Sequence, residues 1–201
     1  MRLKAPQSPS ELRDERELQI KTFIGAAVDA AIVSPVDDLL LVARSPESAA
    51  ARAVFGLSPS LAARGMSARI ILLAANPGDH WTLEFAPGFR HETRLANDPR
   101  LLDAHEQLVI GDRSLWFGDS MRREPEKRDA FMQFIDGDDE TVRRARMTFA
   151  RLWESARPLY RHEQTQAATP LVEVIAPGAG DAALASDVLA TLNAWRPSSR
   201  H

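Results

Sequence analysis

Residues 61–73 read Leu-Ala-Ala-Arg-Gly-Met-Ser-Ala-Arg-Ile-Ile-Leu-Leu and combine a helical pattern with an extended one. The alanine-rich first half is typical of a helix, and Gly65 is suited to its end because glycine readily adopts a positive φ. Residues 68–73 are apolar and β-branched, and Asn76-Pro77-Gly78 follows them, which predicts a buried strand ending in a turn. This direct succession of helix, glycine and buried strand indicates a sheet covered by helices.

The flanking sequence continues the alternation of helical and extended patterns. It predicts a flexible tail over residues 1–10 and, over residues 11–201, a single α/β domain with a mixed sheet flanked by helices. Helices are expected from Glu11 to a stop at Pro35, from a cap at Ser45 to a break at Pro59, from Asp138 to a stop at Pro158, and over 181–195. Strands are expected over 39–44, 68–73, 107–110, 115–117, 130–135 and 171–175, with one more within 76–100 and a hairpin joining 107–110 to 115–117.

Bulk composition limits the classes of protein to which this chain can belong. The apolar fraction of 44% and the charged fraction of 26% are typical of a globular domain, and the net charge of −3 makes a general nucleic-acid binder unlikely. The absence of cysteine excludes disulfides and thiolate chemistry. The sequence contains no signal-peptide pattern and no stretch able to span a bilayer, so a cytoplasmic protein without membrane integration is expected. It also contains no phosphate-cradling glycine loop and no dinucleotide fingerprint, and no cofactor is predicted.

Two segments together resemble a known superfamily. The first is the helix end and strand of residues 61–73, and the second runs His105-Glu-Gln107-Leu-Val-Ile-Gly-Asp112 and then Leu115-Trp-Phe-Gly118-Asp119-Ser120. The second is similar to the phospholipase D motif His-x-Lys-x4-Asp-x6-Gly-Ser, which usually has an asparagine two residues after the serine. The resemblance covers residues 35–157 and implies a fold like one phospholipase D-like half.

The resemblance assigns roles to five residues of this sequence. His105 and Asp112 correspond to catalytic positions, with the histidine as the nucleophile that attacks phosphorus. Gln107, Ser120 and Arg122 correspond to positions that bind the phosphoryl group. Gln107 replaces the lysine, Asp119 the glycine and Arg122 the asparagine. Loss of the lysine charge costs such a site about 100- to 1000-fold in rate, and the Asp119 carboxylate would repel a phosphodiester if it faced the cleft.

These departures favour a non-catalytic domain that binds a small phosphate-containing ligand or a protein partner through a degenerate phosphate cleft. The first alternative is a phosphodiesterase or nuclease that acts as a homodimer, because the family combines two motifs in one site and this chain has one. The second is a scaffold or interaction protein that shares only the fold. The histidines and acids His80, His91, His105, Glu84 and Glu92 match no metal-ligand spacing, and no metal site is predicted.

Overall fold

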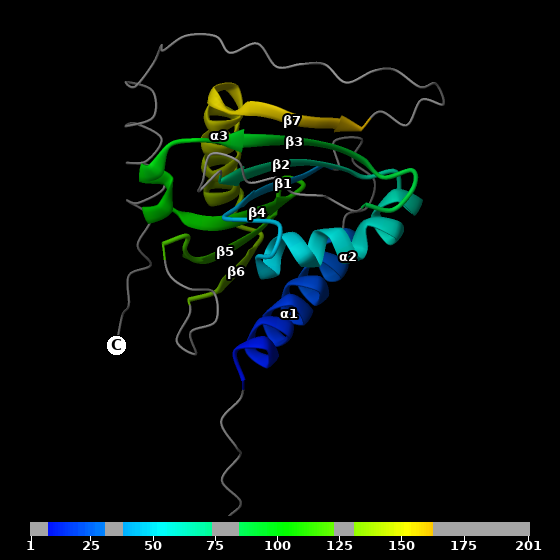
Figure 1. Ribbon diagram of the computed structural model, residues 1–201. Helices are drawn as coiled ribbons and strands as arrows, with labels where there is room; N and C mark the ends of the chain where they lie inside the picture. Colours follow the sequence, from blue (N-terminus) through cyan, green and yellow to red (C-terminus); the bar gives the residue numbers. More distant parts are fainter. Residues whose placement is uncertain (1–7, 31–37, 74–84, 123–130, 163–201) are drawn as a thin grey trace, which may run out of the picture.

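The computed structural model of the chain describes residues 8–30, 38–73, 85–122 and 131–162, which are drawn in colour in Figure 1. Within them, one seven-stranded sheet has the order β6-β5-β4-β1-β2-β3-β7. The strands are β1 (Asp38–Ala43), β2 (Ser67–Leu73), β3 (Arg90–Ala96), β4 (His105–Ile110), β5 (Ser114–Ser120), β6 (Gln133–Asp136) and β7 (Arg157–His162). β1, β2 and β3 are parallel neighbours, whereas β4, β5, β6 and β7 each pair antiparallel. The sheet is therefore mixed, which confirms the predicted α/β class.

Helices cover both faces of this sheet (Figure 1). α1 (Pro9–Ala30) and α2 (Ala49–Ala63) lie on one face and α3 (Asp139–Ser155) on the other, while a short 3₁₀ turn, η1 (Pro99–Asp103), leads into β4. Alternate residues of β1 serve the two cores, because successive side chains of a strand point to opposite faces. Leu39 and Leu41 pack with α1 and α2, and Leu40 and Val42 pack with α3.

The structure corrects the prediction for the segment after β1. One helix, α2, begins after the N-cap Ser48 rather than Ser45, and it continues through Pro59 instead of breaking there. Proline lacks the N–H that would bond the carbonyl four residues earlier. Here the hydroxyl of Ser58 donates to that carbonyl, Phe55 O, at 2.7 Å. The side-chain bond satisfies the carbonyl, and the helix continues.

Other predicted boundaries differ from the structure by a few residues, and one strand was not predicted. α1 begins at Pro9 rather than Glu11, and the strand expected at 130–135 is β6, which begins at Gln133. β7 was not predicted, because Pro158 was interpreted as a helix stop. Pro158 lies in β7, which is an edge strand, where a missing N–H is tolerated. The strand and helix predicted for 171–175 and 181–195 lie outside the described residues.

Candidate functional site

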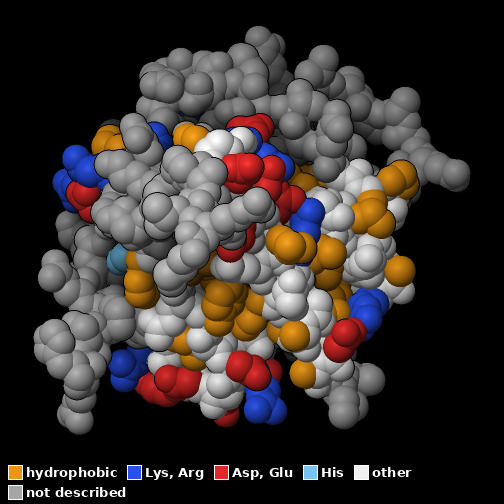
Figure 2. Space-filling model, turned by 90° about the horizontal axis from the view of Figure 1, so that it is seen from below, with side chains coloured by type: hydrophobic (Ala, Val, Ile, Leu, Met, Phe, Trp, Pro, Cys, Tyr) orange, Lys and Arg blue, Asp and Glu red, His pale blue; other side chains and the backbone are white. Residues whose placement is uncertain are grey.

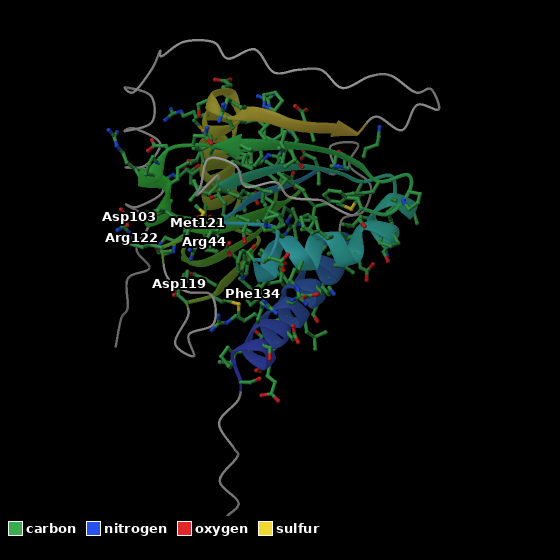
Figure 3. All side chains as sticks on the ribbon, in the orientation of Figure 1. Arg44, Asp103, Asp119, Met121, Arg122 and Phe134 are labelled. Atoms are coloured by element: carbon green, nitrogen blue, oxygen red, sulfur yellow. The ribbon has the colours of Figure 1, made fainter. Side chains whose placement is uncertain are left out.

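Except for Asp112, the residues of the motif gather at one end of the sheet, where β1 and β5 end and β4 begins. Val42 near the end of β1 pairs with Gln107, and His105 at the start of β4 pairs with Ser120 at the end of β5. The ladder between β4 and β5 is irregular between His105 and Gln107, where β5 has an extra residue. Such bulges turn side chains away from their regular direction and are common next to functional sites. Figure 3 labels Arg44, Asp119, Met121 and Arg122 at this end.

His105 is half-buried, and a hydrogen bond to the backbone holds its ring. Its Nδ1 lies 2.9 Å from the carbonyl oxygen of Gly118, and its ring meets the ring of Phe131 edge to face with a centroid distance of 5.9 Å. A carbonyl oxygen can only accept, so Nδ1 carries the hydrogen. In the neutral ring the lone pair is then on Nε2, as a nucleophile or general base requires.

Gln107, in the lysine position, lies in the core. Its side chain is fully buried in β4, and its cross-strand neighbours Val42 and Phe117 belong to the apolar cluster beneath α3. In the described part of the chain neither Oε1 nor Nε2 of this amide has a hydrogen-bond partner. The structure therefore places Gln107 among apolar side chains, without access to solvent.

Asp119 and Ser120 make hydrogen bonds to the backbone of the chain itself. The Asp119 carboxylate accepts the backbone N–H of Ser120 at 2.8 Å and that of Phe131 at 3.4 Å. The Ser120 hydroxyl donates to the carbonyl of Leu102 at 3.0 Å and accepts the backbone N–H of Arg122 at 3.3 Å. These bonds connect the end of β5 to η1 and to the start of the segment leading into β6.

Arg122 forms an ion pair with Asp103 of η1. Its Nε lies 2.5 Å and its Nη2 3.0 Å from the two carboxylate oxygens, a two-point contact that suits the planar guanidinium. Both side chains are exposed, and Figure 3 shows them at the same edge of the molecule. An anionic ligand would have to compete with Asp103 for this arginine.

Asp112 lies at the other end of the hairpin. It is exposed in the turn after Gly111, whose φ is +58°, while the ladder closes there with Ile110 opposite Ser114. His105 is at the opposite end of β4. The structure thus brings His105, Gln107 and Ser120 into neighbouring strands but does not place Asp112 beside them.

Two charged residues at this end were not predicted from the sequence. The Glu106 carboxylate accepts the backbone N–H of Arg44 at 2.9 Å and also receives a hydrogen bond from Ser48, the N-cap of α2. Burial raises the pKa of Glu106, the nearby Arg44 lowers it, and Asp119 raises it further. A glutamate after a motif histidine at the start of a strand carried no signal in the sequence, since its partners Arg44 and Ser48 are brought to it only by the fold.

A further unpredicted feature is the close packing at Gly118. A Cβ built on it would lie 2.5 Å from Cη2 of Trp116 and 3.3 Å from Cβ of Glu106. Glycine is required at this position because there is no room for a side chain, and its carbonyl is the group that holds His105.

Among the described residues, no three His, Asp or Glu side chains come close enough to form a metal site. His91 lies in β3, where its ring stacks on Phe85 and its Nδ1 lies 3.3 Å from the carbonyl of Phe89. His80 and Glu84 lie outside the described residues. No helix within the described ranges is long and apolar enough to cross a membrane.

Comparison with known proteins gives matches among solved structures alone. No family model matches the chain, and no curated protein does. It is similar to NucT from Helicobacter pylori (TM-score 0.49, 14% identity, 73% of this chain and 92% of that chain). It is similar to Nuc from Salmonella typhimurium, described as a phospholipase D family member (TM-score 0.44, 12% identity, 71% and 91%). The chain is also similar to the archaeal chromatin protein TrmBL2 (TM-score 0.46, 15% identity, 73% of this chain and 51% of that chain).

These similarities concern the arrangement of helices and strands. One of the three structures bears the name of the family that the motif resembles. At identities of 12–15% they carry no information on what this chain binds or whether it catalyses a reaction.

Proposed function

We propose that this chain is a non-catalytic phospholipase D-like domain that binds a small phosphate-containing ligand, or a protein partner, at the end of the sheet beside His105. The observation that carries the proposal is the position of Gln107. It replaces the lysine of the motif with an uncharged side chain and is fully buried, so it brings no charge to a phosphoryl oxygen.

The surrounding contacts support a site that no longer performs the reaction. Asp119 and Ser120 bond to the backbone, and Arg122 is paired with Asp103. The charges near Glu106, the neighbour of His105 in β4, include the carboxylate of Asp119 and the guanidinium of Arg44. Two carboxylates beside one arginine stabilise the growing negative charge of a phosphoryl transition state poorly.

A phosphodiesterase that acts as a homodimer is the second candidate, and one observation favours it. The bond from Nδ1 of His105 to Gly118 leaves the lone pair on Nε2, as nucleophilic attack requires. A second copy of the chain would then supply the histidine that protonates the leaving group. A monomer by light scattering at micromolar concentration would exclude this candidate.

The third reading, an interaction protein, predicts a large exposed apolar surface. The exposed large apolar side chains in the described ranges are Leu18, Phe134 and Met147, from α1, β6 and α3. Figure 2 shows apolar side chains near the middle of the lower face, with charged groups around them. Phe134 is partly covered, since its ring lies 5.0 Å from that of Phe23. These side chains belong to separate elements, so we favour the polar end of the sheet as the binding site.

The test compares hydrolysis of bis(4-nitrophenyl) phosphate by three purified proteins: the natural sequence, His105→Ala and Gln107→Lys. We expect no hydrolysis by any of them, together with binding of the same phosphodiester by the natural protein in a fluorescence titration. Activity in the natural protein that disappears in His105→Ala would overturn the proposal and establish the phosphodiesterase. Thermal unfolding of each protein shows whether the variants are folded.

A further inference from the structure

β7 is the last strand at one edge of the sheet. Within the described residues it pairs with β3 alone, and Figure 1 shows it at the outer margin beside β3. The outer side of an edge strand presents a row of unpaired N–H and C=O groups, which act as a template for another strand. Pro158 blunts only the start of this edge, because it lacks an N–H and residues 159–162 keep theirs. The outer side of β7 is therefore a surface that fits an extended segment.

The sequence beyond β7 contains a segment of this kind. Residues 171–175 read Leu-Val-Glu-Val-Ile, and their apolar, β-branched pattern predicts a strand. Pro170 precedes it and Ala176-Pro177-Gly178 follows it, which limits the strand because proline and glycine interrupt regular structure. These residues lie outside the described part of the chain. A strand leaves its backbone groups unpaired when it is alone, so this one requires a neighbour in a sheet.

We propose that residues 171–175 pair antiparallel with the outer side of β7, so that the chain covers its own open edge. The connection, residues 163–170, determines the direction of the pairing. It is long enough for a hairpin loop, whereas a parallel neighbour requires a crossover of about a dozen residues or more. This inference is independent of the proposed function, because β3, β2 and β1 separate β7 from β4 and the candidate site.

The charges of the two segments agree with this pairing. β7 contains Arg157 and Arg161 and no acidic residue, and the one charged residue of 171–175 is Glu173. Opposite charges on neighbouring strands stabilise a sheet, whereas like charges destabilise it. A second copy of β7 would bring arginines against arginines at this edge.

The covalent connection favours the chain's own segment over the same segment of a second copy. A short flexible connection holds the two strands at an effective concentration of roughly millimolar. A second copy at micromolar concentration therefore competes for the same pairing at a disadvantage of about a thousandfold. The consequence is that β7 is closed to other chains, and a homodimer would have to form at another surface.

The experiment measures hydrogen exchange of the full chain by ¹⁵N spectroscopy. In a strand that pairs on one side, alternate N–H groups point to water and exchange quickly, whereas pairing on both sides protects successive N–H groups. We expect every amide of residues 160–162 to exchange at least about 100-fold more slowly than in an unstructured peptide. Nuclear Overhauser contacts should join the backbones of 160–162 and 171–175. Exchange of alternate amides at the unstructured rate would overturn the proposal.

A pair of double variants identifies the covering segment. Val172→Pro with Glu173→Pro removes two successive N–H groups, one of which faces β7 in any register, so part of the protection of residues 160–162 should disappear. Protected amides in the interior strands β1 and β2 show that this variant is folded. Ala167→Pro with Ala168→Pro, in the connection, is the matched control and should leave the protection intact. Unchanged protection in the first variant would mean that another segment covers β7, and the proposal would be wrong.

A mixture of ¹⁵N-labelled and unlabelled chains separates the two possible sources of the segment. We expect the contacts between 160–162 and 171–175 to arise within single chains. Contacts that join a labelled chain to an unlabelled one would overturn this pairing and identify a second copy as the occupant of the edge.

Discussion

Replacement of Gln107 by methionine should make the protein more stable. The two side chains are similar in length and shape, but methionine has no amide. Gln107 is fully buried, and within the described chain both polar atoms of its amide lack a hydrogen-bond partner. A buried polar group without a partner loses its hydration and gains nothing in return, whereas an apolar isostere avoids this cost.

The magnitude follows from the number of unsatisfied groups. A buried, unsatisfied donor or acceptor costs about 1–3 kcal/mol, and part of this is relieved when small movements or a water molecule reach the amide. We therefore expect Gln107→Met to raise the free energy of unfolding by about 2 kcal/mol. In a chain of 201 residues this corresponds to a rise in Tm of roughly 4–8 °C.

The assay is urea and thermal unfolding, with Gln19→Met as the matched control. Gln19 is exposed on α1, so the same substitution there should change stability by less than about 0.5 kcal/mol. A loss of 1 kcal/mol or more in Gln107→Met, with Gln19→Met unchanged, would refute the reasoning. It would mean that the amide is hydrogen-bonded in solution, and Gln107 would become a candidate for contact with a ligand.

Three further predictions concern charge and packing. Burial raises the pKa of Glu106. The stability that this residue provides below about pH 4.5 is therefore lost as the pH rises through the raised pKa. Glu106→Gln should remove this loss in unfolding curves measured across pH. Gly118→Ala should cost about 1–3 kcal/mol because its Cβ would clash with Trp116, whereas Gly25→Ala on α1, with open space around it, should be neutral or stabilising in the same thermal assay. Asp38 pairs with two arginines, so Asp38→Ala should lower stability by about 1–3 kcal/mol in urea unfolding, and an unchanged midpoint would show that the pairs contribute nothing.

The sequence predicted the elements whose residues carry a strong local pattern. Residues 68–73 lie in β2, which begins at Ser67, and Gly111 lies in the turn of the β4–β5 hairpin. The acidic start of α3 also behaves as predicted, with Asp138 as the N-cap that accepts the N–H of Thr141. In each case the signal lies within a few neighbouring residues, so the element can be deduced from the sequence alone.

Errors arose where a side-chain hydrogen bond or the position of a strand in the sheet overrides local preference. Pro59 stays within α2 because the Ser58 hydroxyl satisfies the carbonyl of Phe55, and Pro158 is accepted in β7 because that strand lies at the edge of the sheet. The candidate site shows the same limit. The motif spacing indicates His105, but Arg44 and Ser48 are brought to Glu106 only by the fold, and so these contacts could not be deduced.

Two of the three departures from the phospholipase D motif coincide with a contact inside this chain. A glycine at position 119 could not accept the N–H groups of Ser120 and Phe131, as the carboxylate of Asp119 does. An asparagine at position 122 could not form the two-point ion pair that Arg122 makes with Asp103. A lysine at position 107 would place a charge in the apolar cluster beneath α3. Asp119 and Arg122 thus serve contacts within this domain, and neither needs a phosphoryl group to account for it. His105 is different, because the carbonyl of Gly118 orients its ring and leaves Nε2 with the lone pair, and for this reason the search for a ligand should begin there.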